Sequence, residues 1–378
     1  MKKNIIISGG GTGGHLFPAI AIAQALQKAD NEVNILFVGA KGKIEETKVP
    51  EAGYNIELLN IQGFSRKLSF KNITFLIKLF KSLRKSKKIV KKFKPDVVVG
   101  VGGYASGALV YVATKRGIPG LIQEQNSYPG ITNKILSKRV EKICVAYDGT
   151  ERFFPKEKII KTGNPVRETL LNNDITREEA AKFFGLDPNK KIILSLGGSG
   201  GAKSINDGIA ENIDKLAKTD SQFIWQTGKF YFDEAKKAEN TVKSDNIKVF
   251  AFIKRMDLAY KVADVVISRA GAGTISELCL LEKPAILVPS PNVAEDHQTK
   301  NAKSLVDKQA AILVKDNETK TKLIDTALKL IDNEQEIKIL SENISKQAMQ
   351  NSAEIIAKEV LKLIKQEPKN EACEKSKV

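Results

Sequence analysis

The chain has 378 residues, of which 42% are hydrophobic and 28% charged, and its 61 basic against 44 acidic side chains leave a net charge of +17. This composition is that of a globular protein, and the length exceeds what a single compact core accommodates, so we expect two domains. The charge indicates either a lysine-rich proteome or an anionic partner, while Cys144, Cys279 and Cys373 are too few and too scattered for a disulfide framework or a zinc site.

Short β-branched runs alternate with helical stretches along the whole chain. Apolar strands separated by helices are typical of parallel sheets that are covered on both faces. We therefore expect an α/β protein with two Rossmann-like domains, whose parallel sheets face each other across a cleft. The expected strands are 4–8, 33–38, 56–61, 96–101, 120–123 and 142–146 in the first half, and 192–196, 222–226, 247–252, 264–268, 284–288 and 311–314 in the second.

A glycine-rich turn follows the first expected strand and ends at His15. A strand, a tight glycine turn and a helix together direct backbone N–H groups and the positive end of a helix dipole toward an anion. The turn also fits the dinucleotide pattern G-x-G-x-x-G, but the second strand ends in Gly39-Ala40, without the acid that would hold a ribose. His15 is either a structural ring or a general base that titrates near neutral pH.

Residues 66–94 contain twelve Lys or Arg residues and no acid. At 100° per residue, one stripe contains Ile73, Leu76, Ile77, Phe80 and Leu83, and the basic face contains Lys71, Lys78, Lys81, Lys85 and Lys88. We expect the stripe to pack on the sheet and the surplus apolar residues Phe75 and Leu79 to lie beside the lysines. A solvated helix explains the stripe, whereas a helix docked on an anionic membrane surface also explains the surplus residues. Nucleic acid is a poorer fit, because no aromatic stacking platform accompanies the charge.

The domain boundary is expected near Gly163-Asn164-Pro165. The expected domains are 1–164 and 165–348, with a helix at about 349–365 that returns to pack on the first domain. A helix should start after Thr176, where Glu179 completes a capping box. The charged tail, 366–378, is expected to be disordered.

The second half carries further glycine-rich and polar loops after its expected strands. The turn 197–202 follows the strand 192–196, and the loop 268–277 follows the strand 264–268. Thr274 and Ser276 are candidates to cap the helix that begins in that loop, and Glu277 either complements its dipole or accepts hydrogen bonds from a ribose diol. With 289–298, these loops would form a crevice at the carboxyl ends of neighbouring strands.

Taken together, these motifs resemble the MurG family of glycosyltransferases from about residue 4 to residue 360. The residues that carry the resemblance are Gly10-Gly11-Thr12-Gly13-Gly14-His15-Leu16-Phe17-Pro18, Gln123-Glu124-Gln125-Asn126, Gly163-Asn164-Pro165-Val166-Arg167, Gly197-Gly198-Ser199, Gly201-Ala202, Ser268-Arg269-Ala270-Gly271 and Asp296-His297-Gln298. Gly200 stands where many relatives of the family carry glutamine, and Gly273 stands where some carry a larger apolar residue. The resemblance implies the GT-B fold, with the acceptor on the N-terminal domain.

The resemblance also implies a binding site for a UDP-sugar. Arg167 would approach the diphosphate, the backbone of Ile253 the uracil, Glu277 the ribose and Gln298 the sugar hydroxyls, while Ala272–Glu277 would contribute as a loop. No cofactor is implied, and the absence of any D-x-D sequence fits a metal-free mechanism. The full set of implied substrate-binding residues is Thr12, Gly13, Gly14, Asn126, Arg167, Ser199, Ile253, Ala272, Gly273, Thr274, Ile275, Ser276, Glu277 and Gln298.

By this resemblance the protein is an inverting hexosyltransferase of peptidoglycan synthesis, which moves N-acetylglucosamine from UDP-N-acetylglucosamine to the C4 hydroxyl of the undecaprenyl-linked muramyl-pentapeptide. His15 is the expected base or hydroxyl-orienting group, although a bound water or Asn126 could share that role, and the turn at Tyr104 would cradle the acceptor diphosphate. Two alternatives remain: a UDP-sugar 2-epimerase or diacylglycerol glycosyltransferase of the same fold, and a non-catalytic protein that binds nucleic acid or membrane.

The expected location is the cytoplasmic side of the cell membrane, as a peripheral protein. The only apolar run near the N-terminus is too short for a signal peptide, and no stretch approaches the length of a membrane span. Tyr104, Phe75, Leu79, Lys78 and Lys81 are the residues expected to face the acceptor or the membrane. The expected partners are the donor, the lipid-linked acceptor and an anionic membrane surface, with cell-wall synthesis proteins as further candidates and nucleic acid excluded.

Overall fold

The computed structural model describes residues 2–63, 71–170, 174–198, 200–242 and 244–365. The chain forms two compact units. The first contains the residues up to 125, 129–165 and those from 351 onward, and the second contains 126–128 and 166–350. The expected tail and Ser199 lie outside the described residues.

Among the described residues, the first unit is built on a seven-stranded parallel sheet with the order β3-β2-β1-β4-β5-β6-β7. The interior strand β1 consists largely of buried isoleucines, of which Ile5 and Ile7 belong to the core on one face of the sheet and Ile6 to the core on the other. Ile6 pairs in register with Leu36 of β2 and with Val98 of β4. The strands are β1 (Lys3–Ser8), β2 (Val33–Ala40), β3 (Asn55–Leu59), β4 (Val97–Gly100), β5 (Gly120–Glu124), β6 (Lys142–Val145) and β7 (Ile159–Lys161).

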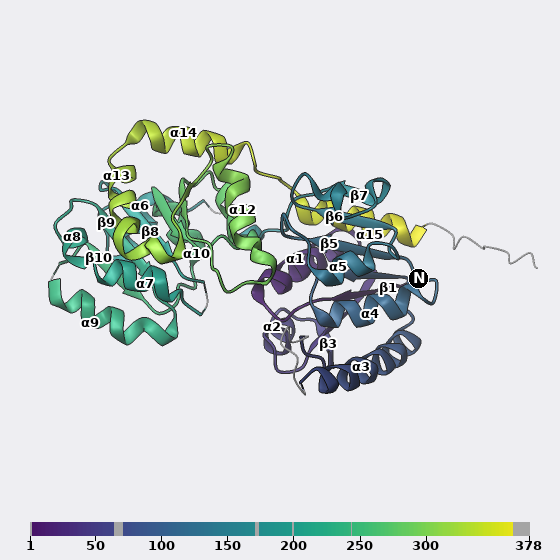
Figure 1. Cartoon of the computed structure of the whole chain (residues 1–378). Helices are drawn as coiled ribbons and strands as arrows, with labels where there is room; N and C mark the ends of the chain where they lie inside the picture. The colour runs from purple at the N-terminus through teal and green to yellow at the C-terminus, as the bar shows by residue number, and fades with distance from the viewer. Residues whose placement is uncertain (1, 64–70, 171–173, 199, 243, 366–378) are drawn as a thin grey trace, which may run out of the picture. The chain divides into compact units, whose positions relative to one another are not determined.

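Helices cover both faces of this sheet (Figure 1). One face packs against α1 (Gly13–Ala29) and α15 (Ser352–Lys365), and α15 brings Ile356 and Val360 into the same core as Leu16 and Ile22 of α1. The other face packs against α3, α4 and α5, whose buried residues surround Ile6 and Val98. The remaining helices of the unit are α2 (Glu45–Glu51), α3 (Lys71–Phe93), α4 (Tyr104–Thr114) and α5 (Ile131–Leu136).

The second unit repeats this architecture with a six-stranded parallel sheet, counted over the described residues, in the order β10-β9-β8-β11-β12-β13. In both sheets the order of the strands reverses beside the first strand, between β1 and β4 and between β8 and β11. Open α/β sheets bind their ligands at such a switch point. The strands are β8 (Ile192–Leu196), β9 (Gln222–Gln226), β10 (Ile247–Phe250), β11 (Val265–Ser268), β12 (Ala285–Leu287) and β13 (Ile312–Leu313).

The helices of the second unit form two layers around its sheet. One layer contains α6 (Arg177–Phe184), α10 (Met256–Val262), α11 (Ala272–Leu280) and α12 (His297–Val306), and the other α7 (Lys203–Ala210), α8 (Ile213–Ala217), α9 (Phe232–Val242) and α13 (Ile324–Ile331), with α14 (Glu334–Ser345) contributing to both cores. The capping box predicted at Thr176 is confirmed, because its hydroxyl accepts from Glu179 N at 3.2 Å and its own N–H donates to the Glu179 carboxylate at 2.9 Å.

Candidate functional site

The second glycine turn joins β8 to α7 at the point where the strand order of the sheet reverses. Gly198 and Gly201 have positive φ angles of 75° and 81°. A Cβ atom on Gly201 would lie 2.1 Å from the carbonyl oxygen of Thr227, so no side chain fits there. Gln226 Nε2 also donates to Gly198 O at 2.9 Å. The turn is therefore held tightly against the end of β9 and presents backbone at the carboxyl edge of the sheet.

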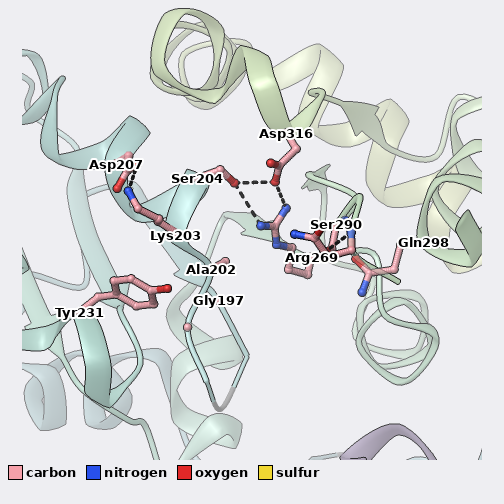
Figure 2. Close-up of a pocket in the computed structure, with 12 residues that line it drawn as sticks. Gly197, Ala202, Lys203, Ser204, Asp207, Tyr231, Arg269, Ser290, Gln298 and Asp316 are labelled. Atoms are coloured by element: carbon pink, nitrogen blue, oxygen red, sulfur yellow. Dashed lines mark hydrogen bonds and ion pairs between the residues drawn. The ribbon is translucent and has the colours of Figure 1, made fainter. Parts of the chain in front are cut away.

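A pocket of about 490 Å³ opens beside this turn (Figure 2). Its walls come from the segments that follow β8, β9, β11, β12 and β13, from α7 and from the start of α12. The predicted residue Gln298 lies in this wall, where its side-chain oxygen accepts from Ser290 N at 2.9 Å. The pocket is lined by Gly197, Gly201, Ala202, Lys203, Ser204, Asp207, Tyr231, Arg269, Ser290, Asn292, Gln298 and Asp316.

Ion pairs organise the polar side chains of the pocket. Arg269 pairs with Asp316, and Ser204 joins them, because its hydroxyl donates to Asp316 at 2.6 Å and accepts from Arg269 at 3.1 Å (Figure 2). Lys203 pairs with Asp207 at 2.6 Å across one helical turn of α7. These cations are balanced by neighbouring acids, so the wall is polar and preorganised.

Glu277 lies in the second turn of α11, with its carboxylate mostly buried. It accepts hydrogen bonds from Arg167 Nη2 at 3.1 Å and from Tyr260 Oη at 3.0 Å. Burial raises the pKa of Glu277, and the Arg167 guanidinium opposes that rise. Burial likewise raises the pKa of Tyr260 well above its usual value, so its hydroxyl stays protonated and donates. Two residues predicted for the same site, Arg167 and Glu277, are thus brought together, with Tyr260 as an unpredicted third member.

The segment Ala272–Glu277 is helical, so the expectation that it contributes as a loop is wrong. The helix α11 begins at Ala272 with Gly271 as its N-cap, and therefore neither Thr274 nor Ser276 caps it. Ser276 instead donates back to Ala272 O at 3.0 Å. Ile275 is buried in the core, whereas a Cβ atom on Gly273 would meet open space. The first turn of α11 therefore offers backbone N–H groups at the edge of the sheet.

Two further predicted residues lie in the second unit. Ile253 is buried and lies three residues after the end of β10. Asn126 Oδ1 accepts from Asn301 Nδ2 at 3.2 Å, and Asn301 Oδ1 accepts from Ser127 N at 3.0 Å. Asn301, which is fully buried, thereby anchors the short segment 126–128 on α12. An asparagine inside a helix has no distinctive sequence signal, and so this anchor was not predicted.

The first glycine turn joins β1 to α1 in the other unit. Thr12 is the N-cap of α1, Gly13 and Gly14 start the helix, and the Thr12 hydroxyl lies 3.4 Å from His15 Nδ1. The His15 ring rests on the loop after β4, since a Cβ atom on Gly102 would lie 2.7 Å from His15 Cδ2. A buried acid missed by sequence reasoning, Glu45, accepts the N–H of Gly11. Glu45 lies five residues after the end of β2, whereas the dinucleotide pattern requires an acid at the end of that strand.

The helix α3 is rotated relative to the prediction. Leu76, Ile77 and Phe80 are 61%, 51% and 55% exposed, whereas Phe75 and Leu79 are only partly exposed. The prediction that the stripe with Leu76, Ile77 and Phe80 packs on the sheet is therefore wrong, and so is the placement of Phe75 and Leu79 as surplus surface residues. Leu83, from the same stripe, does pack at the edge of the core.

Two serines explain the rotation of α3. Ser82 and Ser86 are buried, and these small side chains let the helix approach β3 and α4 closely. Phe75 lies on the same side, edge-on to Tyr104 at a ring-centre distance of 6.3 Å. Hydrophobic periodicity treats serine as a polar residue, and it therefore predicted the wrong face of α3 to be buried. The basic side chains are divided as well: Lys78 donates to Gln62 at 2.7 Å, while Lys81 and Lys88 are exposed.

Comparison with known proteins places this arrangement in a class. The two Rossmann-like units superpose on the crystal structure of MurG from Acinetobacter baumannii with a TM-score of 0.77 and 27% identity, over 95% of this chain and 99% of that one. The UDP-GlcNAc 2-epimerase of Neisseria meningitidis, at 18% identity and a TM-score of 0.67, covers 95% of this chain and 100% of its own and shares the fold. Since an epimerase also has this fold, the fold alone places the chain in the GT-B structural class.

The family follows from the sequence comparisons. The glycosyltransferase family 28 N-terminal domain matches residues 5–145, and the glycosyltransferase family 28 C-terminal domain matches residues 192–360. The UDP-N-acetylglucosamine--N-acetylmuramyl-(pentapeptide) pyrophosphoryl-undecaprenol N-acetylglucosamine transferase of Phocaeicola vulgatus is 56% identical over 96% of this chain and 97% of its own. The Bacteroides thetaiotaomicron protein of the same name is 54% identical over 97% and 99%. The chain belongs to glycosyltransferase family 28, and within it to the MurG transferases.

Proposed function

We propose that this protein transfers N-acetylglucosamine from UDP-N-acetylglucosamine to the C4 hydroxyl of the undecaprenyl-pyrophosphoryl-muramyl-pentapeptide, which converts lipid I to lipid II in peptidoglycan synthesis. The observation that carries this proposal is the identity of 56% with a transferase of that name over nearly the full length of both chains. The protein is accordingly a hexosyltransferase. The chain has two compact units and matches both family 28 domains, which is consistent with one unit for each substrate.

The donor is assigned to the second unit. Arg167 would release part of its pairing with Glu277 to approach the diphosphate, and the Glu277 carboxylate would then accept from the ribose hydroxyls. The N–H groups of the second glycine turn and of the first turn of α11 would stabilise the charge that develops on the leaving UDP. Gln298 would bind the sugar hydroxyls, and the backbone of Ile253 the uracil. Ser199 belongs to the same proposed set.

The acceptor is assigned to the first unit, with His15 as its catalytic residue. In the step we propose, the C4 oxygen of the acceptor attacks the anomeric carbon of the donor, and the bond from that carbon to the UDP oxygen breaks. The acceptor proton passes to His15, and the configuration at the anomeric carbon inverts. Thr12 beside the ring and Tyr104 at the start of α4 would orient the acceptor.

Membrane attachment is proposed to occur through α3. Among the residues described, no helix combines the length and the apolar character that crossing a bilayer requires. The exposed side chains of Leu76, Ile77 and Phe80, next to exposed Lys81 and Lys88, fit a surface that inserts apolar groups between anionic headgroups. Such a surface would hold the enzyme on the cytoplasmic face of the membrane, where its lipid-linked acceptor resides.

The decisive experiment is a transfer assay with labelled UDP-N-acetylglucosamine and a lipid-linked muramyl acceptor. We expect the label to enter the lipid fraction, and we expect far less transfer from the C4 epimer of the donor, UDP-N-acetylgalactosamine. Conversion of the donor to its 2-epimer without labelling of the lipid would contradict the proposal. A thermal-shift comparison, in which UDP stabilises the protein more than other nucleoside diphosphates do, checks donor selectivity separately.

A further inference from the structure

The buried acid Glu45 is the starting point of a further inference. It is the first residue of α2 and is 1% exposed. Both of its carboxylate oxygens accept from Gly11 N, at 3.0 and 2.9 Å, and Oε1 also accepts from Ala40 N at 2.9 Å. The carboxylate is therefore held by backbone amides of the loop that follows β1 and of the last residue of β2. A buried carboxylate needs such partners, because burial without them is costly.

The first glycine turn is shaped around this carboxylate. Gly10 has a φ of 138°, and a Cβ atom there would lie 2.3 Å from Glu45 Cδ. A Cβ atom on Gly39 would similarly lie 2.5 Å from Glu45 Cγ. The contacts leave no space for any side chain at these glycines. Glu45 thus sets the path of the backbone from Gly10 to the start of α1.

The opposite side of the turn leads to His15. A Cβ atom on Gly103 would lie 2.6 Å from Gly10 O, and one on Gly102 would lie 2.8 Å from His15 Nε2. The turn is therefore packed between the Glu45 carboxylate and the loop after β4, on which the imidazole rests. A shift of Gly10 and Gly11 would be transmitted to Thr12 and to the His15 ring.

We propose that Glu45 is a positioning residue that holds the first glycine turn so that His15 meets the acceptor hydroxyl. The inference rests on the proposed function, in which His15 receives the acceptor proton. The Gly11 N–H, which a phosphate-binding turn would offer to its ligand, is instead taken by an anion of the protein itself. A second anion at Gly11 would be repelled by Glu45, so the Gly11 N–H is not offered to a phosphate.

The test is Glu45→Gln, with Glu46→Gln as the matched control. Glutamine has the same shape, but it removes the negative charge and replaces one of the two oxygens that accept from Gly11 N by an NH₂ group, which cannot accept. Glu46, the second residue of α2, also accepts a backbone N–H, from the exposed Gly42 at 2.6 Å. We expect Glu45→Gln to lower kcat on the order of 10²-fold, with KM for UDP-N-acetylglucosamine unchanged. Glu46→Gln should retain the wild-type kcat.

A second readout does not depend on activity. The chain contains 2 histidines, so a ¹H–¹³C spectrum of the imidazole Cε1–H groups gives one signal each for His15 and His297, assigned with a His297→Asn variant. Glu45→Gln should move the His15 signal and leave that of His297. Three outcomes would overturn the proposal. They are an unmoved His15 signal, a kcat within twofold of wild type, or a fall in both the donor affinity and the melting temperature. If the wild type transfers nothing to the lipid, the proposed function fails, and the His15 signal still decides whether Glu45 positions the ring.

Discussion

Glu277 shows how one carboxylate can serve structure and ligand binding in turn. In the structure it is held by Arg167 and Tyr260, and its pKa is raised by burial against the opposing effect of the guanidinium. A ribose diol would give the same carboxylate new donors and would leave Arg167 available for the diphosphate. The pair is therefore preorganised for a ligand that carries hydroxyls next to negative charge.

We expect Glu277→Gln to weaken UDP binding by roughly 10- to 100-fold, since a hydrogen bond to a charged group contributes about 1.5–3 kcal/mol. Isothermal titration calorimetry with UDP measures the change. The control is Glu342→Gln, at an exposed position of α14 in the same unit, which should bind UDP like the wild type. An unchanged UDP affinity in Glu277→Gln would remove this residue from the donor site.

Lys283 provides a prediction about stability and pH. Burial lowers its pKa to about 8, and its ammonium group donates to Ala263 O at 2.8 Å. The unfolded chain holds this proton up to about pH 10.4, so between these values it binds more protons than the folded chain. The contribution of Lys283 to the free energy of unfolding should therefore rise from pH 8 to pH 10.

Urea denaturation at several pH values measures this contribution. In Lys283→Met the rise in the free energy of unfolding between pH 8 and pH 10 that Lys283 causes should disappear. Lys329→Met, at an exposed position of α13, should show the same pH dependence as the wild type. Parallel stability curves for Lys283→Met and the wild type over this pH range would show that burial does not depress the pKa of Lys283.

At the scale of the element, the proposed membrane attachment depends on how α3 is oriented on the first unit. Its buried serines turn Leu76, Ile77 and Phe80 outward, so the apolar residues that the sequence pattern placed in the core are available to a bilayer. We expect Leu76→Glu with Phe80→Glu to reduce binding to vesicles containing phosphatidylglycerol by at least tenfold, because full burial of each large apolar side chain contributes about 1.5–3 kcal/mol.

Vesicle co-sedimentation measures this binding. Phe183→Glu is a matched control, since Phe183 is 59% exposed on α6 in the second unit. This variant should bind vesicles like the wild type, and the α3 variant should keep its UDP affinity. Equal loss of vesicle binding in both variants would mean that exposed aromatic residues act non-specifically, and α3 would not be the docking surface.

At the scale of the whole molecule, each unit has its own buried core, and α15 completes that of the first unit from the far end of the chain. Ile356 of α15 is fully buried beside α1. We expect Ile356→Ala to lower the free energy of unfolding of the first unit by about 2–5 kcal/mol. The core of the second unit does not include α15 and should keep its stability.

Hydrogen exchange followed by mass spectrometry resolves the two units. In Ile356→Ala, amides of β1 and β4 should exchange faster, while those of β8 and β11 should be unchanged. Lys358→Ala, at an exposed position of the same helix, should leave all four strands protected. Faster exchange in β8 would show that the stability of the second unit depends on α15.

Local signals in the sequence accounted for most of the elements. Apolar β-branched runs marked the central strands, glycines marked the turns where φ is positive, and Thr176 with Glu179 marked the start of α6. The strand β7, three residues long at the sheet edge, was missed because so short a run carries almost no periodicity. The family was also recognisable from the sequence, since its motifs lie within short contiguous segments.

The sequence by itself thus determined the fold class, the glycine turns and the family, because each depends on residues that are neighbours in the chain. Only the tertiary structure decided the rotation of α3, the partner of Arg167 and the place of Glu45. Glu45 lies 34 residues from Gly11, and Arg167 lies 110 residues from Glu277. Such contacts arise when distant segments pack, and the free energy that selects them, from burial and satisfied hydrogen bonds, has no counterpart in local sequence periodicity.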